Sequence, residues 1–253
     1  MNQIEICFSP ALINQYLKKE AVVVMTDVFR ASTTICTAFA NGAKSIIPVA
    51  TQEEALAYKE QGYLTGAESK VDRCDFADFG NSPYEYTREK VEGNDIVLTT
   101  SNGTRAVKSA ADCYLLLIGA FVNLRAVAER CKAEKKDVLI VCAGWKGRIC
   151  VEDSLFAGAL TSYLLEDDNF KAASDGTRIA VSLWHHANKD FNKYIMKSEH
   201  AVRLLSHGFE DDLEYCLKQN ILDVVPELSG NRLICNASDN VRSRGCREAV
   251  TVE

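Results

Sequence analysis

The 253-residue sequence has no apolar run that approaches the ~20 residues of a membrane-spanning helix. Its first ten residues lack the basic segment and the apolar segment of a secretory signal peptide. A surplus of positive charge is also absent, since the formal net charge is -6 at pH 7. Nucleic-acid-binding proteins usually carry a basic surplus or stripe. We therefore expect a cytoplasmic protein with no nucleic-acid or membrane partner, although this net charge does not exclude a local cationic pocket for a small anion.

The ten cysteines include no C-x-x-C pair, so neither a zinc knuckle nor a thioredoxin-type motif is present. Several cysteines fall in apolar segments, where a free cysteine acts as a small hydrophobic residue. The four histidines all fall in the last third of the chain, and their spacing matches no known metal motif. The sequence thus predicts a reduced protein without a structural metal, and it assigns no histidine a catalytic role.

Strand and helix patterns alternate over most of the first 165 residues. Apolar residues 21–26 predict a strand covered on both faces. Residues 31–40, which precede Asn41-Gly42, predict a helix with its C-terminal signal. This alternation favours the α/β class, as a three-layer α/β/α fold around a largely parallel or mixed sheet.

We expect a single domain over residues 1–235 and a polar C-terminal tail over 236–253. Residues 22–40 weakly resemble residues 139–163, which is compatible with two similar halves at about 1–120 and 121–235. The alternative, that all βα units look alike, explains this similarity equally well.

The patterns also set the expected bounds of each element. Strands are predicted at 4–8, 21–26, 45–49, 95–100, 114–118 and 137–142, and helices at 10–19, 31–40, 51–62, from about 103, 122–132, 151–165, 175–195, 198–207 and 210–219. Residues 66–91 crowd Gly, Pro and polar residues without a period, which predicts a long connection. Long loops inside compact domains are often functional.

Polar loops that carry an arginine follow three of the predicted strands. Ligands of open α/β sheets bind beyond the carboxyl ends of the strands, where helix N-termini offer backbone N–H groups to anions. Arg30, Arg105 and Arg148 lie just past these strand ends, and a guanidinium there can make a two-pronged contact with phosphate, sulfonate or carboxylate. The loops therefore predict one site for a small, multiply charged anion.

Acidic residues also lie just past the carboxyl ends of these predicted strands. Asp27 directly follows the strand at 21–26, where a carboxylate can bind Mg²⁺ or act as a nucleophile. Its alternative role is to cap the next helix. Glu152 and Asp153 open the helix at 151–165, either as metal ligands or as partners of the helix dipole.

Hydroxyl and amide side chains add candidate contacts to phosphate. Residues 99–104 offer four hydroxyls, an amide and a glycine before a helix, and either bind phosphate oxygens or only cap that helix. Asn81 and Ser82 are a weaker signal, because such triplets with Pro83 occur in ordinary turns.

Cys142 and Arg148 fit the spacing C-x5-R between a strand and a helix. This is the phosphate loop of cysteine-dependent phosphatases, in which a thiolate attacks phosphorus and the arginine holds the oxygens. The histidine that usually precedes the cysteine is replaced by Val141.

These segments form an ordered set of short motifs: Asp27-Val-Phe-Arg30-Ala-Ser-Thr-Thr, Ala40-Asn-Gly-Ala43, Gly66-Ala-Glu68, Gly80-Asn-Ser-Pro83, Thr99-Thr-Ser-Asn-Gly-Thr-Arg105, Cys142-Ala-Gly144, Val151-Glu-Asp153, Gly158-Ala, Asp211-Asp-Leu-Glu-Tyr-Cys216 and Val225-Pro226. In this order they resemble the 2-phosphosulfolactate phosphatases over about residues 4–235. Trp145-Lys146 departs from the family, where smaller or more polar residues are expected.

The resemblance implies a Mg²⁺-dependent phosphatase that hydrolyses 2-phospho-3-sulfolactate, or a related 2-phospho-hydroxyacid, to sulfolactate and phosphate. In methanogens this step leads toward coenzyme M. The resemblance and the C-x5-R spacing together lead us to expect catalytic roles for Asp27, Arg30, Arg105 and Cys142. The substrate-binding residues are expected to be Asn81, Ser82, Thr100, Asn102, Gly103, Thr104, Gly144 and Arg148. Mg²⁺ is expected at Asp27, Glu68, Glu152 and Asp153.

Two alternatives stay open. One is metal-free hydrolysis with Cys142 as nucleophile and Arg148 as its anion ligand. The other is a non-catalytic protein that binds phosphorylated or sulfonated metabolites. In each case a small anionic molecule is the expected partner, and a homodimer is the expected assembly because it is the commonest one.

Overall fold

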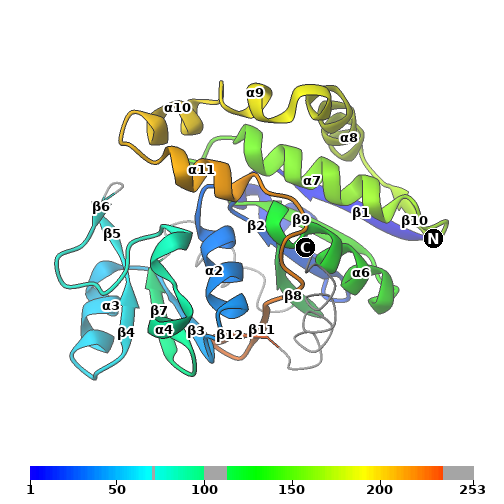
Figure 1. The fold of residues 1–253 in the computed structure, drawn as a ribbon. Coiled ribbons are helices and arrows are strands. Elements are labelled where there is room, and N and C mark those ends of the chain that lie inside the picture. The colour runs from blue at the N-terminus through cyan, green and yellow to red at the C-terminus, as the bar shows by residue number, and fades with distance from the viewer. Residues whose placement is uncertain (70–71, 100–112, 236–253) are drawn as a thin grey trace, which may run out of the picture.

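The computed structural model describes residues 1–69, 72–99 and 113–235 (Figure 1). Several predicted features lie outside these residues: Thr100, Asn102, Gly103, Thr104, Arg105, the helix expected from about residue 103 and the tail 236–253.

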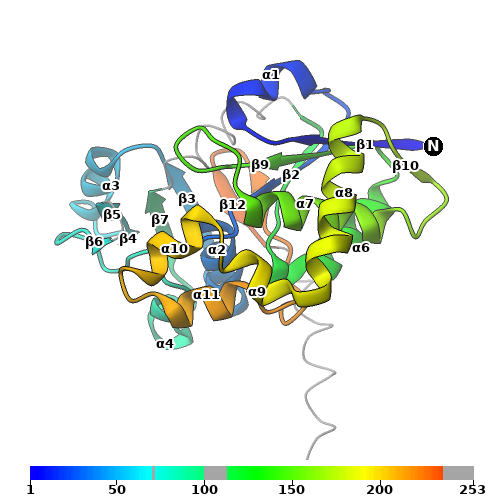
Figure 2. The ribbon, with the colours of Figure 1, turned by 90° about the horizontal axis from the view of Figure 1, so that it is seen from above.

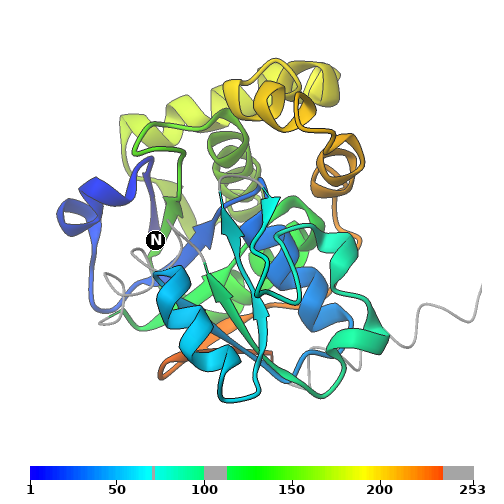
Figure 3. The same ribbon diagram turned by 90° about the vertical axis from the view of Figure 1, so that its left-hand side faces the viewer.

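A ten-stranded sheet forms the centre of the molecule. Five neighbouring strands at one end run parallel: β10 (Phe170–Ala172), β1 (Asn2–Cys7), β9 (Val138–Cys142), β2 (Val22–Thr26) and β8 (Leu115–Ile118). Three strands at the other end are parallel to one another: β3 (Ser45–Val49), β7 (Asp95–Thr99) and β4 (Leu64–Gly66). Figure 3 shows this three-stranded end from the side.

A short hairpin joins the two parallel parts. It consists of β11 (Glu227–Ser229) and β12 (Arg232–Ile234). β11 pairs antiparallel with β8 through Glu227 and Leu117, and β12 pairs antiparallel with β3 through Leu233 and Ile46. The sheet is therefore mixed and mostly parallel, as the sequence predicts. The five-stranded part draws strands from both sides of residue 120, so the sheet itself is not divided there.

The helices are α1 (Ile13–Tyr16), α2 (Ala31–Ala40), α3 (Gln52–Lys59), α4 (Arg88–Val91), α6 (Leu124–Glu134), α7 (Val151–Leu164), α8 (Asp175–Ala187), α9 (Phe191–Ile195), α10 (Glu199–Leu205) and α11 (Glu210–Cys216). Short 3₁₀ turns are η1 (Pro10–Leu12), η2 (Pro83–Glu85), η3 (Phe121–Asn123) and η4 (Asn188–Asp190). Figures 1 and 2 both show α11 beside α2, although more than 150 residues separate them in sequence.

Side chains on the two faces of β2 enter different hydrophobic clusters. Val22 and Val24 pack in the cluster that contains Leu160 of α7, whereas Val23 packs in the cluster that contains Phe39 of α2. Because successive side chains of a strand point to opposite faces, helices cover both faces of the sheet. The α/β prediction with three layers is thus confirmed.

Close packing of α7 on α8 explains the Gly158-Ala motif. A Cβ added at Gly158 would lie 2.1 Å from the carbonyl oxygen of Ala180 on α8. No larger residue fits without moving a helix, so this glycine sets the separation of α7 and α8.

Most predicted elements match the structure, with α2 and β3 identical to the predicted bounds. The helix expected at 10–19 is shorter, because Leu17 is already extended and α1 ends at Tyr16. The helix expected at 175–195 is interrupted by η4, where Asp190 leaves helical geometry with a ψ of 61°. Residues 66–91 contain the two-stranded pair β5 (Glu68–Ser69) and β6 (Asp72–Arg73), η2 and α4.

Among the described residues, no helix combines the length and the apolar character that crossing a membrane requires.

Candidate functional site

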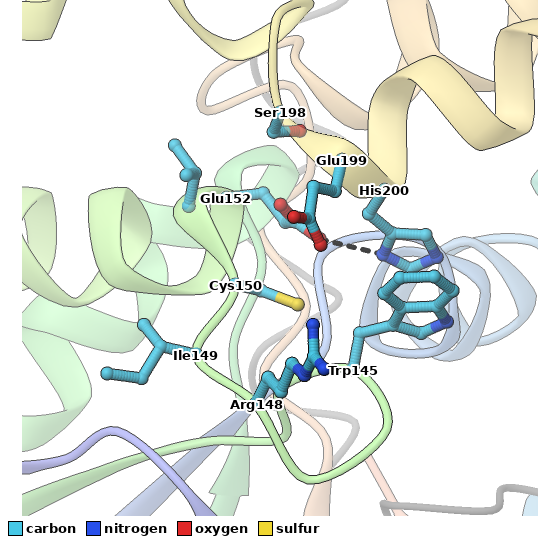
Figure 4. Close-up of a pocket in the computed structure, with 9 residues that line it drawn as sticks. Trp145, Arg148, Ile149, Cys150, Glu152, Ser198, Glu199 and His200 are labelled. Carbon is cyan, nitrogen blue, oxygen red and sulfur yellow. Dashed lines mark hydrogen bonds and ion pairs between the residues drawn. The ribbon is translucent and has the colours of Figure 1, made fainter.

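A pocket of about 280 Å³ opens beside the loop that joins β9 to α7 (Figure 4). One wall comes from this loop and the first turn of α7, and the other comes from the start of α10. The residues that line it are Trp145, Arg148, Ile149, Cys150, Val151, Glu152, Ser198, Glu199 and His200.

The loop from β2 to α2 lies next to this pocket and holds its shape through its own hydrogen bonds. The backbone N–H of Asp27 donates to Ser32 Oγ at 2.9 Å, and the backbone N–H of Ser32 donates to the Asp27 carbonyl at 2.9 Å. Thr33 Oγ1 donates to the Val28 carbonyl at 3.0 Å. The Phe29–Arg30 peptide bond is cis. The predicted Asp27 therefore stands at the carboxyl end of β2 on a closely bonded loop.

Arg30 is buried and pairs with carboxylates of the protein itself. Its Nη1 donates to Asp212 Oδ2 at 2.5 Å, and its Nη2 forms a short ion pair with Glu68 Oε1. The ring of Phe209 lies 4.2 Å from the guanidinium carbon. Arg30 thus ties the start of α2 to the segment after β4 and to α11. In this structure it is not an open clamp for a substrate anion.

Asn81 and Ser82 belong to the same network. The backbone N–H of Asn81 donates to Glu68 Oε1 at 3.1 Å, and its carbonyl accepts from Thr34 Oγ1 at 2.7 Å. Ser82 Oγ donates to Asp212 Oδ1 at 2.6 Å. The loop predicted at 66–91 therefore does reach the carboxyl end of β2, and these polar groups connect it to α2 and α11.

Asp153 joins two loops. Its Oδ1 accepts from the backbone N–H of Val28, and its Oδ2 accepts from that of Gly144, both at 2.9 Å. Burial raises the pKa of Asp153 well above its usual range, and the charges of Glu152 and Asp27 raise it further. Its two oxygens hold the β2–α2 and β9–α7 loops together, so its first role is to position them.

The loop over residues 142–148 does not form the open phosphate cradle that its C-x5-R spacing suggests. Trp145 and Arg148 pair through backbone hydrogen bonds of 3.0 and 2.9 Å, around a turn with positive φ at Lys146 and Gly147. The N–H groups of Ala143 and Gly144 also have acceptors inside the protein. Backbone donors that are already paired are not available to a phosphate.

The environment of Cys142 does not favour a nucleophile. Its side chain is fully buried, and burial raises its pKa well above the usual range, with Asp153 adding to the rise. Reactive cysteines need the opposite, a lowered pKa and access to the substrate. Arg148, in contrast, is exposed and lines the pocket.

The positive φ of Gly144 shows why a glycine follows this strand. Its φ is +65°, and a Cβ there would lie 2.3 Å from the carbonyl oxygen of Arg148. Gly144 thus allows the loop to close on itself, and a role as a direct substrate ligand stays a prediction.

Glu152 faces the pocket together with His200 and Cys150, to which the sequence assigned no role. His200 Nδ1 and Glu152 Oε1 are 2.8 Å apart, and the ring of Trp145 stacks on that of His200 at 5.5 Å between centroids. Cys150 lies beside them, and one ligand atom each from Cys150, Glu152 and His200 lie within 4.8 Å of one another (Figure 4). Glu152 Oε2 is buried and has no hydrogen-bond partner among the described residues.

Sequence reasoning missed His200 and Asp212. Nothing in the spacing of the histidines indicates that α10 carries His200 to the start of α7, since this is set by tertiary packing. Asp212 did have a signal, because it lies in the Asp211-Asp212 motif that supported the family resemblance. Its partner Arg30 is 182 residues away in the chain, so its role could not be inferred.

Negative charge exceeds positive charge in this region. Burial raises the pKa of Asp27 to about 7, and Glu152 contributes to the rise while His200 and Arg30 oppose it. Burial also raises the pKa of Glu68 to about 7, where Arg30 opposes the rise and Asp27 adds to it. Mutual repulsion between Asp27, Glu68 and Glu152 would be relieved by a divalent cation.

Comparison with known proteins gives a consistent result. A family model described as 2-phosphosulpholactate phosphatase matches residues 7–231. The chain is 41% identical over 205 residues to a protein of Thermotoga petrophila, covering 81% of this chain and 88% of that one. It is 37% identical over 228 residues to one of Clostridium tetani (88% and 96%) and 32% identical over 237 residues to one of Clostridium beijerinckii (92% and 99%). All three relatives bear the name "Probable 2-phosphosulfolactate phosphatase".

Proposed function

Because this chain belongs to the 2-phosphosulfolactate phosphatase family and is thus a phosphoric monoester hydrolase, we propose that it releases phosphate from 2-phospho-3-sulfolactate in a Mg²⁺-dependent reaction. The observation that supports this most directly is the group of carboxylates around the carboxyl end of β2, next to a pocket that an exposed arginine lines.

Asp27 and Glu68 are the residues we assign to Mg²⁺. Burial raises the pKa of Glu68 and the charge of Asp27 adds to the rise, which supports a cation between the two carboxylates. Oxygen ligands of this kind suit Mg²⁺, which proteins commonly hold through one or two carboxylates and the substrate phosphate. Bound there, the ion would offset charge that develops on the phosphoryl oxygens. Asp153 is a weaker candidate ligand, because both of its oxygens accept backbone hydrogen bonds.

Arg148 is the residue we assign to a charged group of the substrate. It is exposed, it lines the pocket, and its backbone position is fixed by the hydrogen-bonded turn to Trp145. A guanidinium binds phosphate, sulfonate and carboxylate in two-pronged geometry. Arg105 and Asn102 stay predicted contacts to the same substrate, outside the described residues.

Phosphate release from synthetic 2-phospho-3-sulfolactate, measured with and without Mg²⁺, tests the proposal. We expect Asp27→Asn to lower kcat/KM by about 100-fold or more, since it removes charge from the reacting centre. We expect Arg148→Ala mainly to raise KM, by roughly 10-fold. Asp175→Asn is the matched control, because Asp175 is an exposed acid in the first turn of α8.

A full rate after removal of Mg²⁺, or in Asp27→Asn, would contradict the assignment. If metal-free activity were instead abolished by Cys142→Ser, the cysteine-dependent alternative would replace it. Saturable binding without phosphate release from any 2-phospho-hydroxyacid would favour the non-catalytic alternative.

The homodimer and the link to coenzyme M biosynthesis are parts of the same proposal. A homodimer predicts a molar mass of twice 28.0 kDa by light scattering at micromolar concentration. The pathway requires that cells lacking the enzyme accumulate the phosphorylated sulfonate.

A further inference from the structure

The pocket wall contains three potential metal ligands that the Mg²⁺ assignment leaves unused. Cys150 precedes α7, Glu152 lies in its first turn, and His200 lies at the start of α10. Their ligand atoms lie within 4.8 Å of one another, and all three side chains line the pocket (Figure 4).

Glu152 provides an independent indication that something binds here. Its side chain is 2% exposed, and its Oε2 has no hydrogen-bond partner among residues 1–69, 72–99 and 113–235. A buried carboxylate oxygen without a partner is costly, so such an atom is usually satisfied by a ligand, an ion or water. The atom belongs to the same carboxyl group that contacts His200.

We propose that Cys150, Glu152 and His200 bind a divalent ion of the zinc class, separate from the Mg²⁺ assigned to Asp27 and Glu68. Thiolate and imidazole ligands select Zn²⁺ and similar ions, whereas Mg²⁺ prefers oxygen ligands alone. Three protein ligands leave a fourth position open, as in catalytic zinc sites. That position faces the pocket, where an oxygen of a bound anion can take it.

Small movements bring the ligands to the geometry of a bound ion. His200 Nδ1 and Glu152 Oε1 lie 2.8 Å apart as a hydrogen-bonded pair. Metal–ligand bonds of about 2.0 Å at a tetrahedral angle place two such atoms roughly 3.3 Å apart. Binding exchanges the hydrogen bond for two metal–ligand bonds, and the thiol of Cys150 loses its proton to solvent. The His200 ring keeps its orientation, because it stacks on Trp145 and meets Phe29 edge-on.

Co²⁺ is the probe that tests this site, because a thiolate bound to Co²⁺ gives a charge-transfer band and a tetrahedral ion gives intense d–d bands. The full-length protein is stripped of metal, titrated with Co²⁺ and then with Zn²⁺, in the presence of excess Mg²⁺. We expect one equivalent of Co²⁺ to produce both sets of bands and Zn²⁺ to remove them, while Mg²⁺ does not compete.

Variants separate the site from other thiols. Cys150→Ser should abolish the charge-transfer band, and Glu152→Gln and His200→Gln should each weaken Co²⁺ binding by at least about tenfold. Cys131→Ser is the matched control, because Cys131 is also buried but lies in α6. Circular dichroism confirms that each variant is folded.

The proposal is overturned if no charge-transfer band forms, if the band survives in Cys150→Ser, or if Mg²⁺ displaces Co²⁺ as readily as Zn²⁺ does. These outcomes leave phosphate release with Mg²⁺ untouched. The two proposals can therefore fail separately. Loss of the Co²⁺ bands would overturn the zinc-class site, and loss of phosphate release would overturn the phosphatase proposal.

Discussion

Two neighbouring parts of the site differ in how their polar groups are satisfied. Around Arg30 and Asp153, the guanidinium and the carboxyl groups pair with one another or with backbone N–H groups of the protein, and Asn81 Oδ1 is the exception that has no partner among the described residues. Across the pocket, a buried oxygen of Glu152 has no partner among the described residues, and Cys150 and His200 lie beside it. The first part, which we term the braced part, is a scaffold that fixes the loops. The second, the pocket wall, presents side-chain atoms that an ion or a ligand can bind.

Arg30→Ala should have the largest effect, because it removes the charge that Glu68 and Asp212 share. Breaking a buried ion pair leaves an uncompensated charge, so we expect the free energy of unfolding to fall by about 3–5 kcal/mol. Urea unfolding measures this loss. Arg148→Ala, at an exposed position of the pocket wall, should change stability by less than about 0.5 kcal/mol. If the two variants lost similar amounts of unfolding free energy, the braced part and the pocket wall would not differ in their contribution to stability.

Asp153→Ala should come next, since it deprives the N–H groups of Val28 and Gly144 of their acceptor. Each unsatisfied buried donor costs about 1–3 kcal/mol, so we expect the loss of both acceptors to cost at least about 2 kcal/mol. The control is Asp175→Ala, which removes an exposed acid from the first turn of α8. If both variants lost the same stability, Asp153 would act through the helix dipole and would not join the loops.

Asp27 should make the stability of the metal-free protein depend on pH. Burial raises its pKa from 3.8 to about 7, so the folded state holds a proton that the unfolded state has released. Stability from this group is therefore full below about pH 4 and is lost as pH rises through about 7. Asp27→Asn should be more stable than the unchanged protein at about pH 8, by up to about 4 kcal/mol, and similar at about pH 4. Urea unfolding at both pH values checks this, and a pH-independent difference would refute it.

Trp145→Ala should lower the stability of the fold less than Arg30→Ala or Asp153→Ala does. Trp145 lies on the pocket wall, and its stacking on His200 is worth about 0.5–1.5 kcal/mol. Trp184→Ala is an informative comparison, because Trp184 is buried in the core between α8 and its neighbours and its truncation should cost about 3–5 kcal/mol. Thermal unfolding of both variants measures the contrast. An equal loss would mean that the pocket wall is as closely packed as the core.

Local sequence signals predicted most of the longer helices and strands, and they singled out several residues of the braced part. The apolar run before Asp27 and the Asn41-Gly42 signal define β2 and α2, because strand patterns and helix ends depend on nearby residues. Residues Asn81 and Ser82 were placed at the site from motif order alone, and the structure does bring them to Arg30 through Glu68 and Asp212.

Features that depend on tertiary packing could not be read from the sequence. His200 reaches Glu152 only because α10 folds back over the start of α7. The C-x5-R spacing suggested an open phosphate loop, which the structure does not form. Spacing alone does not show that the Asp153 carboxyl group and the Arg148 carbonyl already accept N–H groups of this loop. The strands β11 and β12 are three residues each, too short for a period, and only the Gly230-Asn231 turn indicates a hairpin.

That hairpin lies between β8 and β3, although it is the last strand pair of the described chain. Ribosomes release the chain from its N-terminus, so these strands emerge after all the other described ones. Until residues 227–234 appear, the edges of β8 and β3 lack the strands that separate them in the finished sheet. Open edges of this kind pair readily with other chains. The nascent protein therefore exposes both edges until residues 227–234 have emerged, and deletion of these residues should split one sheet into two.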